Sequence, residues 1–171
     1  MAVDAPARAA VKLALVRVDD RLIHGQVVVG WVRMAGATRI VVADDAVAKD
    51  EMQKTLMRFA APPGVETSIL PVEDAANALL HNAFPDDTIM LLTRGPQQLV
   101  QLMAAGVPLT RVDVGNVGGA SGRTRLTKEV AAGPDDLAAW RALDQAGVKL
   151  QAVWVPGATV TDFNRVIRGR A

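Results

Sequence analysis

The chain has 171 residues and a mass of 18.1 kDa, which fits a single domain. It contains no cysteine, so disulfide scaffolds, thiol catalysis and cysteine-ligated zinc are excluded. Its 19 Lys and Arg balance 18 Asp and Glu, and aromatic residues make up 4%, which argues against a protein whose main task is binding nucleic acid.

The sequence gives no sign of a membrane span or a secretory signal. The longest uncharged apolar stretch, around residues 27–32, is far shorter than the ~20 residues that a membrane helix needs. Residues 1–12 lack the basic and apolar regions of a signal peptide. We therefore expect a flexible tail over residues 1–12, followed by one cytoplasmic domain over residues 13–171.

Short apolar runs alternate with helical segments in the first half of the chain. The runs predict strands over residues 13–18, 39–43, 65–70 and 88–93. The segments between them predict helices over residues 26–34, 45–60 and 74–81. Gly36 ends the first helix, Asp45 caps the second, and Pro62-Pro63-Gly64 terminates it.

The same alternation continues in the second half. Strands are predicted over residues 111–114 and 148–155, with a short strand near 125–130. Helices are predicted over residues 96–105, from Pro134 to just before Gly147, and over 161–167. The helix that opens at Pro134 carries Leu137, Trp140 and Leu143 on one stripe. We assign Trp140, like Trp31, to the core.

Continuous apolar strands separated by helices predict a three-layer α/β domain. Its sheet is mostly parallel and open, and helices cover both faces. Ligands of such sheets bind at the carboxyl ends of the strands. The loops after the first and fifth strands are therefore the candidate site, and the loop after the first strand is the predicted active loop.

The first of these loops carries Asp19, Asp20, Arg21 and His24. His24 stands just before a predicted helix, whose free N–H groups favour an anion. Arg21 offers a planar donor fork that fits phosphate, and Gly25 leaves room for close approach. Asp19 or Asp20 is placed to orient the ring of His24 as a nucleophile. The alternative is that Asp20 only forms a turn and Arg21 is only solvated.

The second loop is rich in glycine, at positions 115, 118, 119 and 122. This spacing matches neither the dinucleotide fingerprint nor the P-loop, so a nucleotide is not expected. The glycines serve either a tight turn or a backbone nest for phosphate. Arg123 and Arg125, which follow, form a positive rim for an acidic partner or are solvated. His81 is expected to be solvated at a helix end.

Residues 17–27, together with Trp31, resemble the start of the IIB component of mannose-family (mannose/fructose/sorbose) sugar phosphotransferase systems (PTS). The segment reads Arg17-Val18-Asp19-Asp20-Arg21-Leu22-Ile23-His24-Gly25-Gln26-Val27. The likeness continues through residues 40–48, 54–56, 61–65 and 116–119, and covers residues 13 to about 160. The chain differs in having Ala120-Ser121-Gly122 where the family commonly has a longer loop with Met and an aromatic residue.

The resemblance implies a phosphotransferase. A IIA partner would pass a phosphoryl group to Nδ1 of His24, which would hand it to a sugar carried by the membrane components IIC and IID. Arg21 and Asp19 would complete the catalytic group. The expected phosphate-binding residues are Arg21, Gly25, Gln26, Asn116, Gly118 and Gly119.

The same resemblance implies no cofactor and no metal, and a cytoplasmic protein that lies at the inner face of the membrane when bound to its permease. Two alternatives stay open. One is a regulatory phosphoacceptor with the same histidine chemistry but no permease. The other is a plain sugar-phosphate or nucleotide-binding domain. The sequence does not indicate which sugar is served.

Overall fold

The computed structural model describes residues 11–119 and 121–170, apart from the side chains of Gln26 and Val27. The predicted tail, residues 1–12, lies outside the described residues except for its last two. The strands are β1 (Leu13–Val18), β2 (Arg39–Ala43), β3 (Glu66–Leu70), β4 (Ile89–Thr93), β5 (Arg111–Val114), β6 (Thr124–Arg125), β7 (Ala131–Ala132), β8 (Lys149–Ala152) and β9 (Thr161–Asp162). The helices are α1 (Gly25–Ala35), α2 (Asp45–Ala48), α3 (Glu51–Ala60), α4 (Val72–Leu80), α5 (Pro96–Ala104), α6 (Pro134–Gln145) and α7 (Phe163–Arg168).

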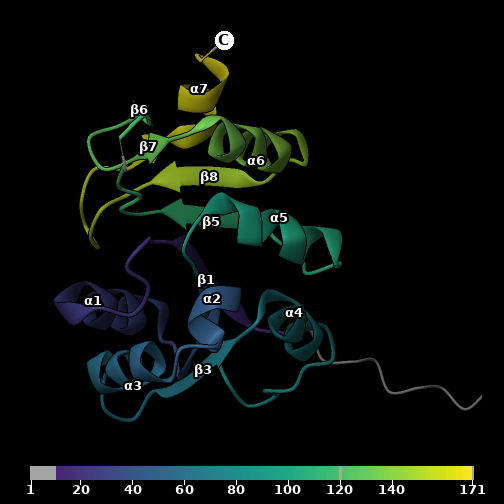
Figure 1. Ribbon diagram of the computed structural model, residues 1–171. Coiled ribbons are helices and arrows are strands. Elements are labelled where there is room, and N and C mark those ends of the chain that lie inside the picture. The colour runs from purple at the N-terminus through teal and green to yellow at the C-terminus, as the bar shows by residue number, and fades with distance from the viewer. Residues whose placement is uncertain (1–10, 120, 171) are drawn as a thin grey trace, which may run out of the picture.

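Seven strands form one open sheet in the order β3-β2-β4-β1-β5-β8-β9 (Figure 1). All neighbours pair in parallel except β9, which runs antiparallel to β8. Helices α4 to α7 pack on one face, and α1 to α3 on the other. The predicted three-layer, mostly parallel α/β fold is confirmed.

Two apolar layers hold the helices on the sheet. The interior strand β4 is buried along its whole length, as a strand covered on both faces should be. Trp31 and Trp140 are 2% and 0% exposed, so their assignment to the core is confirmed. Trp140 packs edge-on against Phe163 of α7, with ring centroids 5.1 Å apart. None of the helices in residues 11–119 and 121–170 is long and apolar enough to cross a membrane.

The prediction of one helix over residues 45–60 is wrong. The segment forms two helices, because two aspartates cap it in succession. Asp44, rather than Asp45, accepts from the Val47 N–H at 2.8 Å and caps α2. Asp50 then accepts from the Gln53 N–H at 3.0 Å and starts α3. Such side chains compete with the helical hydrogen bonds and favour a new N-terminus.

Two predicted strands also differ from those in the structure. Of the strand predicted near residues 125–130, Arg125 lies in β6 and Val130 forms an isolated bridge with Val117. The residues between them form a turn, in which the Leu126 N–H donates to the Val130 carbonyl at 2.8 Å. The strand predicted over residues 148–155 ends at Ala152, because the carbonyls of Val153 and Trp154 accept from the Arg17 side chain. The predicted helix over 161–167 begins two residues later, after the short strand β9.

Candidate functional site

The two predicted loops leave the sheet side by side. Strands β1 and β5 pair in parallel with Val18 opposite Val114, so both loops start at the same edge. The Asp20 carboxylate joins them: Oδ1 accepts from Asn116 Nδ2 at 3.2 Å, and Oδ2 accepts from the Gly118 N–H at 2.7 Å. The structure therefore brings the predicted residues of both loops together, with Asp20 as their link.

Asp19 is the aspartate that faces His24. Its carboxylate is buried, and Oδ1 lies 3.4 Å from Nε2 of the imidazole. The same oxygen accepts from the Arg21 N–H at 3.2 Å, and the Asp19 N–H donates to the Thr93 carbonyl at 3.0 Å. The carboxylate is thus fixed by its own loop and by the end of β4. Of the two candidates for orienting the ring, only Asp19 lies beside it.

The imidazole turns one nitrogen inward. The His24 side chain is 19% exposed, yet its Nε2 is buried against Asp19 and makes no hydrogen bond within the described residues. This leaves Nδ1 as the nitrogen available to a reactant. An N–H at Nε2, close to the Asp19 carboxylate, is the tautomer that this geometry favours, and it places a lone pair on Nδ1.

Helix α1 begins directly after His24, which is its N-cap residue. Gly25 has a φ of +46°, a conformation that glycine adopts without strain. Leu22 has a φ of +57° and is fully buried, so the loop is held in an uncommon conformation by its packing. The first turn of α1 carries no acidic residue and its N-cap side chain makes no capping bond, so its N–H groups face His24 without a competing carboxylate in this turn.

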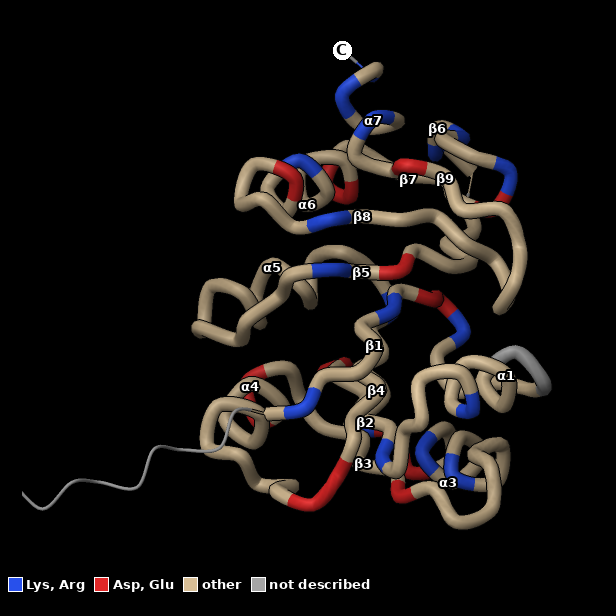
Figure 2. The backbone as a smooth tube through the Cα atoms, turned by 180° about the vertical axis from the view of Figure 1, so that it is seen from behind, with Lys and Arg blue, Asp and Glu red and all other residues tan. Residues whose placement is uncertain are grey.

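Where β1 ends, two adjacent aspartates lie between two arginines along the chain (Figure 2). Arg21 is half-exposed, with its Nε 3.9 Å from Asp19 Oδ1. Arg17 is 1% exposed: Nη1 donates to the Val153 carbonyl at 2.9 Å and Nη2 to the Trp154 carbonyl at 2.8 Å. Nη2 also lies 3.8 Å from Asp19 Oδ2. The carboxylate that faces His24 is therefore held between two arginines.

Sequence reasoning gave Arg17 no role. Its guanidinium stacks on the Trp31 ring at 4.3 Å from the centroid, and a Cβ on Gly115 would overlap it. Burial lowers the pKa of Arg17, whereas the carboxylates of Asp19 and Asp113 raise it. Burial in turn raises the pKa of Asp113, whereas Arg111 and Arg17 lower it. The only signal in the sequence was a charged residue inside an apolar strand.

The remaining predicted residues lie at varied distances from this centre. Asn116 and Gly118 direct donors at Asp20, and Gly119 is exposed on the same loop. The side chain of Gln26 lies outside the described residues. Arg123 donates to the Gly118 carbonyl at 2.9 Å and pairs with Asp136 at 2.6 Å, so it braces the glycine loop instead of forming an open rim.

Arg125 donates to the Lys128 carbonyl and is exposed. The exposed His81 contacts the Asn77 carbonyl through Nδ1 at the end of α4, as expected for a solvated helix end. Trp154 and Lys128, which no motif indicated, lie beside Arg21 around an open cavity of about 310 Å³.

Comparison with known proteins gives one consistent result. A family model described as "PTS system sorbose subfamily IIB component" matches residues 13–170. The fructose-specific EIIB component of Bacillus subtilis (strain 168) is 37% identical over 156 residues, 91% of this chain and 96% of that protein. The mannose-specific EIIAB component of Escherichia coli (strain K12) is 34% identical over 139 residues, 81% of this chain but 43% of that protein. The crystal structure of the IIBSor domain of the sorbose permease from Klebsiella pneumoniae superposes with a TM-score of 0.89 at 34% identity, covering 94% of this chain and 98% of that one.

Proposed function

The chain belongs to the sorbose subfamily of PTS IIB components, and on this premise we propose that it is a phosphoryl carrier with His24 as its phosphorylated residue. The donor is a phosphorylated IIA protein. The acceptor is a sugar held by the membrane components IIC and IID. Residues 13–171 form the IIB domain that carries out both transfers.

The observation that supports this proposal most directly is the placement of the imidazole between a buried carboxylate and a helix N-terminus. With Nε2 buried and 3.4 Å from Asp19, Nδ1 is the ring nitrogen left for the transfer. In the first transfer, Nδ1 attacks the phosphorus of the donor phosphohistidine. The donor P–N bond breaks as the Nδ1–P bond forms, and Asp19 stabilises the positive charge that develops on the His24 ring.

The phosphoryl oxygens need donors that are in place before the transfer. The N–H groups at the start of α1, from Gly25 and Gln26 onward, are the nearest helix donors to His24. Arg21 is half-exposed, so its guanidinium can turn onto the phosphoryl group without leaving the loop. Asn116 and Gly118 act through Asp20, and their binding to phosphate, like that of Gly119, would require this loop to shift.

In the second transfer the Nδ1–P bond breaks while a P–O bond forms to a sugar hydroxyl. The hydroxyl proton passes to the freed Nδ1, and the resulting imidazolium returns this proton to water. A carrier must release its phosphoryl group, so the site should stabilise the transferring group more than the bound intermediate.

The proposed partners follow from family membership. The mannose-specific relative carries A and B in its printed name, and the match covers 43% of it, which supports a IIA domain as the phosphoryl donor. The sorbose structure is named as a domain of a permease, which supports IIC and IID as the membrane partners. The carrier would then act in the cytoplasm, at the inner face of the membrane.

Labelling by a phosphorylated IIA protein tests the proposal. The wild-type protein and His81→Gln should take up radiolabelled phosphate, whereas His24→Gln should take up none. His81 is the matched control, since it is an exposed histidine far along the chain from the site. NMR of the labelled protein should place the phosphorus on Nδ1. Label retained by His24→Gln, or absent from the wild-type protein, would show that His24 is not the acceptor.

A further inference from the structure

We propose that an open cavity lined by Arg21 of the His24 loop, with Trp154 as its aromatic wall, is the subsite that receives the acceptor sugar during the second transfer. This inference rests on the proposed function. The cavity has a volume of about 310 Å³ and is lined by Arg21, Asn116, Lys128, Glu129 and Trp154. That volume lies at the small end of the range for small-molecule sites, on the scale of one monosaccharide.

Trp154 is the exposed tryptophan of the protein. Trp31 and Trp140 are buried, whereas Trp154 is 50% exposed. Its backbone is fixed, because its carbonyl accepts from Nη2 of the buried Arg17 at 2.8 Å. An indole held in this way offers a rigid apolar face, against which the C–H face of a sugar ring can pack.

The other walls provide both donors and acceptors. Arg21 and Lys128 donate, the Glu129 carboxylate accepts, and the Asn116 amide can do either. The wall is built on hydrogen-bonded backbone, since the Glu129 carbonyl accepts from the Val117 N–H at 3.0 Å. A sugar needs this mixture because each hydroxyl donates and accepts. The two cations against one carboxylate also suit an acceptor that becomes an anionic phosphate ester.

The cavity shares its wall with the phosphorylation site. The Arg21 N–H donates to the Asp19 oxygen that lies 3.4 Å from His24 Nε2, and Arg21 itself lines the cavity. Asn116, on the opposite loop, is bonded to Asp20. A sugar on Trp154 would therefore lie next to the arginine that is proposed to hold the phosphoryl group, with one hydroxyl able to attack the phosphorus.

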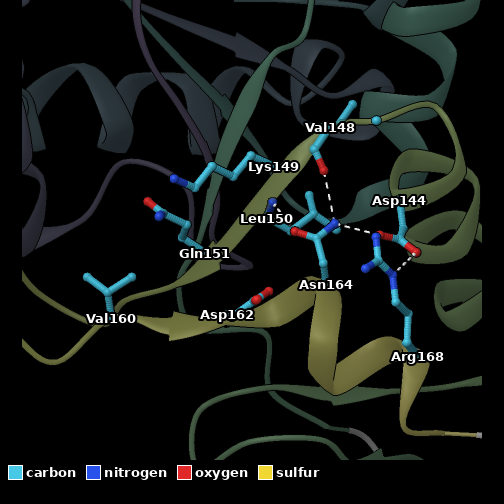
Figure 3. Close-up of a pocket in the computed structure, with 10 residues that line it drawn as sticks. Asp144, Val148, Lys149, Leu150, Gln151, Val160, Asp162, Asn164 and Arg168 are labelled. Carbon is cyan, nitrogen blue, oxygen red and sulfur yellow. Dashed lines mark hydrogen bonds and ion pairs between the residues drawn. The ribbon is translucent and has the colours of Figure 1, made fainter.

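A second cavity, of about 450 Å³, is less suited to binding a sugar than the cavity lined by Trp154 (Figure 3). It lies between β8 and α7, and its central polar groups are bonded to one another. Asp144 accepts from Asn164 Nδ2 and Arg168 Nη2 at 2.7 Å each. These groups are occupied by one another, and none of the described residues that line the cavity is aromatic. The cavity lined by Trp154 has an aromatic wall, and its Arg21 belongs to the loop that carries His24.

Measuring the charging of His24 and its discharge to sugar separately distinguishes a sugar subsite at Trp154 from a surface that docks a protein partner. We would compare wild type, Trp154→Ala, Trp154→Phe and a matched control, Phe59→Ala, whose side chain is 84% exposed on α3. Charging by phosphorylated IIA should be equal in all four. Discharge to sugar through membranes bearing IIC and IID should show a KM for the sugar that is about tenfold higher in Trp154→Ala only, because the aromatic contact is lost. Trp154→Phe keeps an aromatic face and should stay near the wild-type value.

Each other outcome has a definite meaning. Slower charging of Trp154→Ala, or a higher concentration of this variant needed to saturate the membranes, would show that Trp154 docks a protein partner, and the subsite proposal would be wrong. Unchanged discharge by Trp154→Ala would overturn it as well, while leaving the proposed function intact. Failure of the wild-type protein to be charged at His24 would instead refute the proposed function.

Direct binding gives an independent readout. The indole N–H signals of the three tryptophans are followed by NMR while D-mannose, D-fructose, L-sorbose or N-acetylgalactosamine is added at millimolar concentrations, with glycerol as the control. A saturable shift of the Trp154 signal alone, for at least one sugar, is expected. Equal shifts with glycerol, or none with any sugar, would overturn the subsite.

Discussion

Replacing Gly115 by alanine is expected to expel the buried charge of Arg17, which lies on β1, the strand that pairs with β5 just before Gly115. A Cβ at this position would overlap the Arg17 guanidinium, although the backbone conformation of Gly115 suits any residue. The guanidinium would have to leave its position over Trp31 and release the carbonyls of Val153 and Trp154. The change therefore removes the interactions of Arg17 without removing Arg17.

The size of the effect follows from those contacts. Each hydrogen bond from the charged Arg17 to a carbonyl contributes about 1.5–3 kcal/mol, and breaking a buried charged network costs about 3–5 kcal/mol. Gly115→Ala should therefore lower the free energy of unfolding by about 3–5 kcal/mol. In a protein that already carries Arg17→Ala, the same methyl group meets no guanidinium and should cost less than about 0.5 kcal/mol.

Urea unfolding of four proteins measures this coupling: wild type, Gly115→Ala, Arg17→Ala and the double variant. We expect a coupling energy of about 3 kcal/mol, at the upper end of the range for residues in contact. Additive losses would refute the reasoning, because they would mean that Gly115 is required for some reason other than the space that Arg17 occupies.

Three further predictions concern single positions. Arg21→Lys keeps the charge but loses the planar fork, so charging of His24 should slow about tenfold with an unchanged melting temperature; a wild-type rate would remove Arg21 from the site. Asp19→Asn should slow charging about 100-fold and spread the label between both ring nitrogens, which NMR of the phosphorylated protein would reveal. Hydrogen bonds from Arg168, opposed by partial burial, lower the pKa of Asp144. Its ionised form therefore stabilises the fold at neutral pH, and this stabilisation is lost below about pH 4. Asp144→Asn should melt below wild type at neutral pH, with the difference closing on acidification, and a constant difference would contradict this account.

The sequence was sufficient for features that are local along the chain. Strand β1, helix α1 with its terminal Gly36, and the cluster of Asp19, Arg21 and His24 all depend on residues within a few positions of one another. Period and capping rules act at this range, so they placed the loop between β1 and α1 where the structure has it. They failed at α2 and α3, where Asp44 and Asp50 offer two N-caps within one helix length and the pattern alone does not choose between them.

The contacts that sequence reasoning missed join distant segments. Arg17 and Val153 are 136 positions apart, and nothing local to either residue predicts their hydrogen bond. Trp154 was overlooked for the same reason, because its exposure depends on where β8 ends and its anchoring depends on a side chain from β1. The residues of the proposed sugar subsite therefore come from distant parts of the chain, and only the folded structure brings them together.

Arg17 lies near the end of β1 and Asp19 comes directly after this strand. Because side chains two residues apart along extended backbone point to the same side, the two are neighbours. The two oxygens of the Asp19 carboxylate have different neighbours: Oδ2 lies 3.8 Å from Arg17 Nη2, and Oδ1 lies 3.4 Å from His24 Nε2. A lone buried aspartate would hold a positively charged phosphohistidine ring strongly and make discharge slow. If His24 is the phosphorylated residue, as we propose, the neighbouring guanidinium already offsets much of that negative charge, so Asp19 would orient the ring while the intermediate stayed transferable. Since the same guanidinium also holds the Trp154 carbonyl, Arg17 connects the proposed phosphorylation site to the proposed sugar wall.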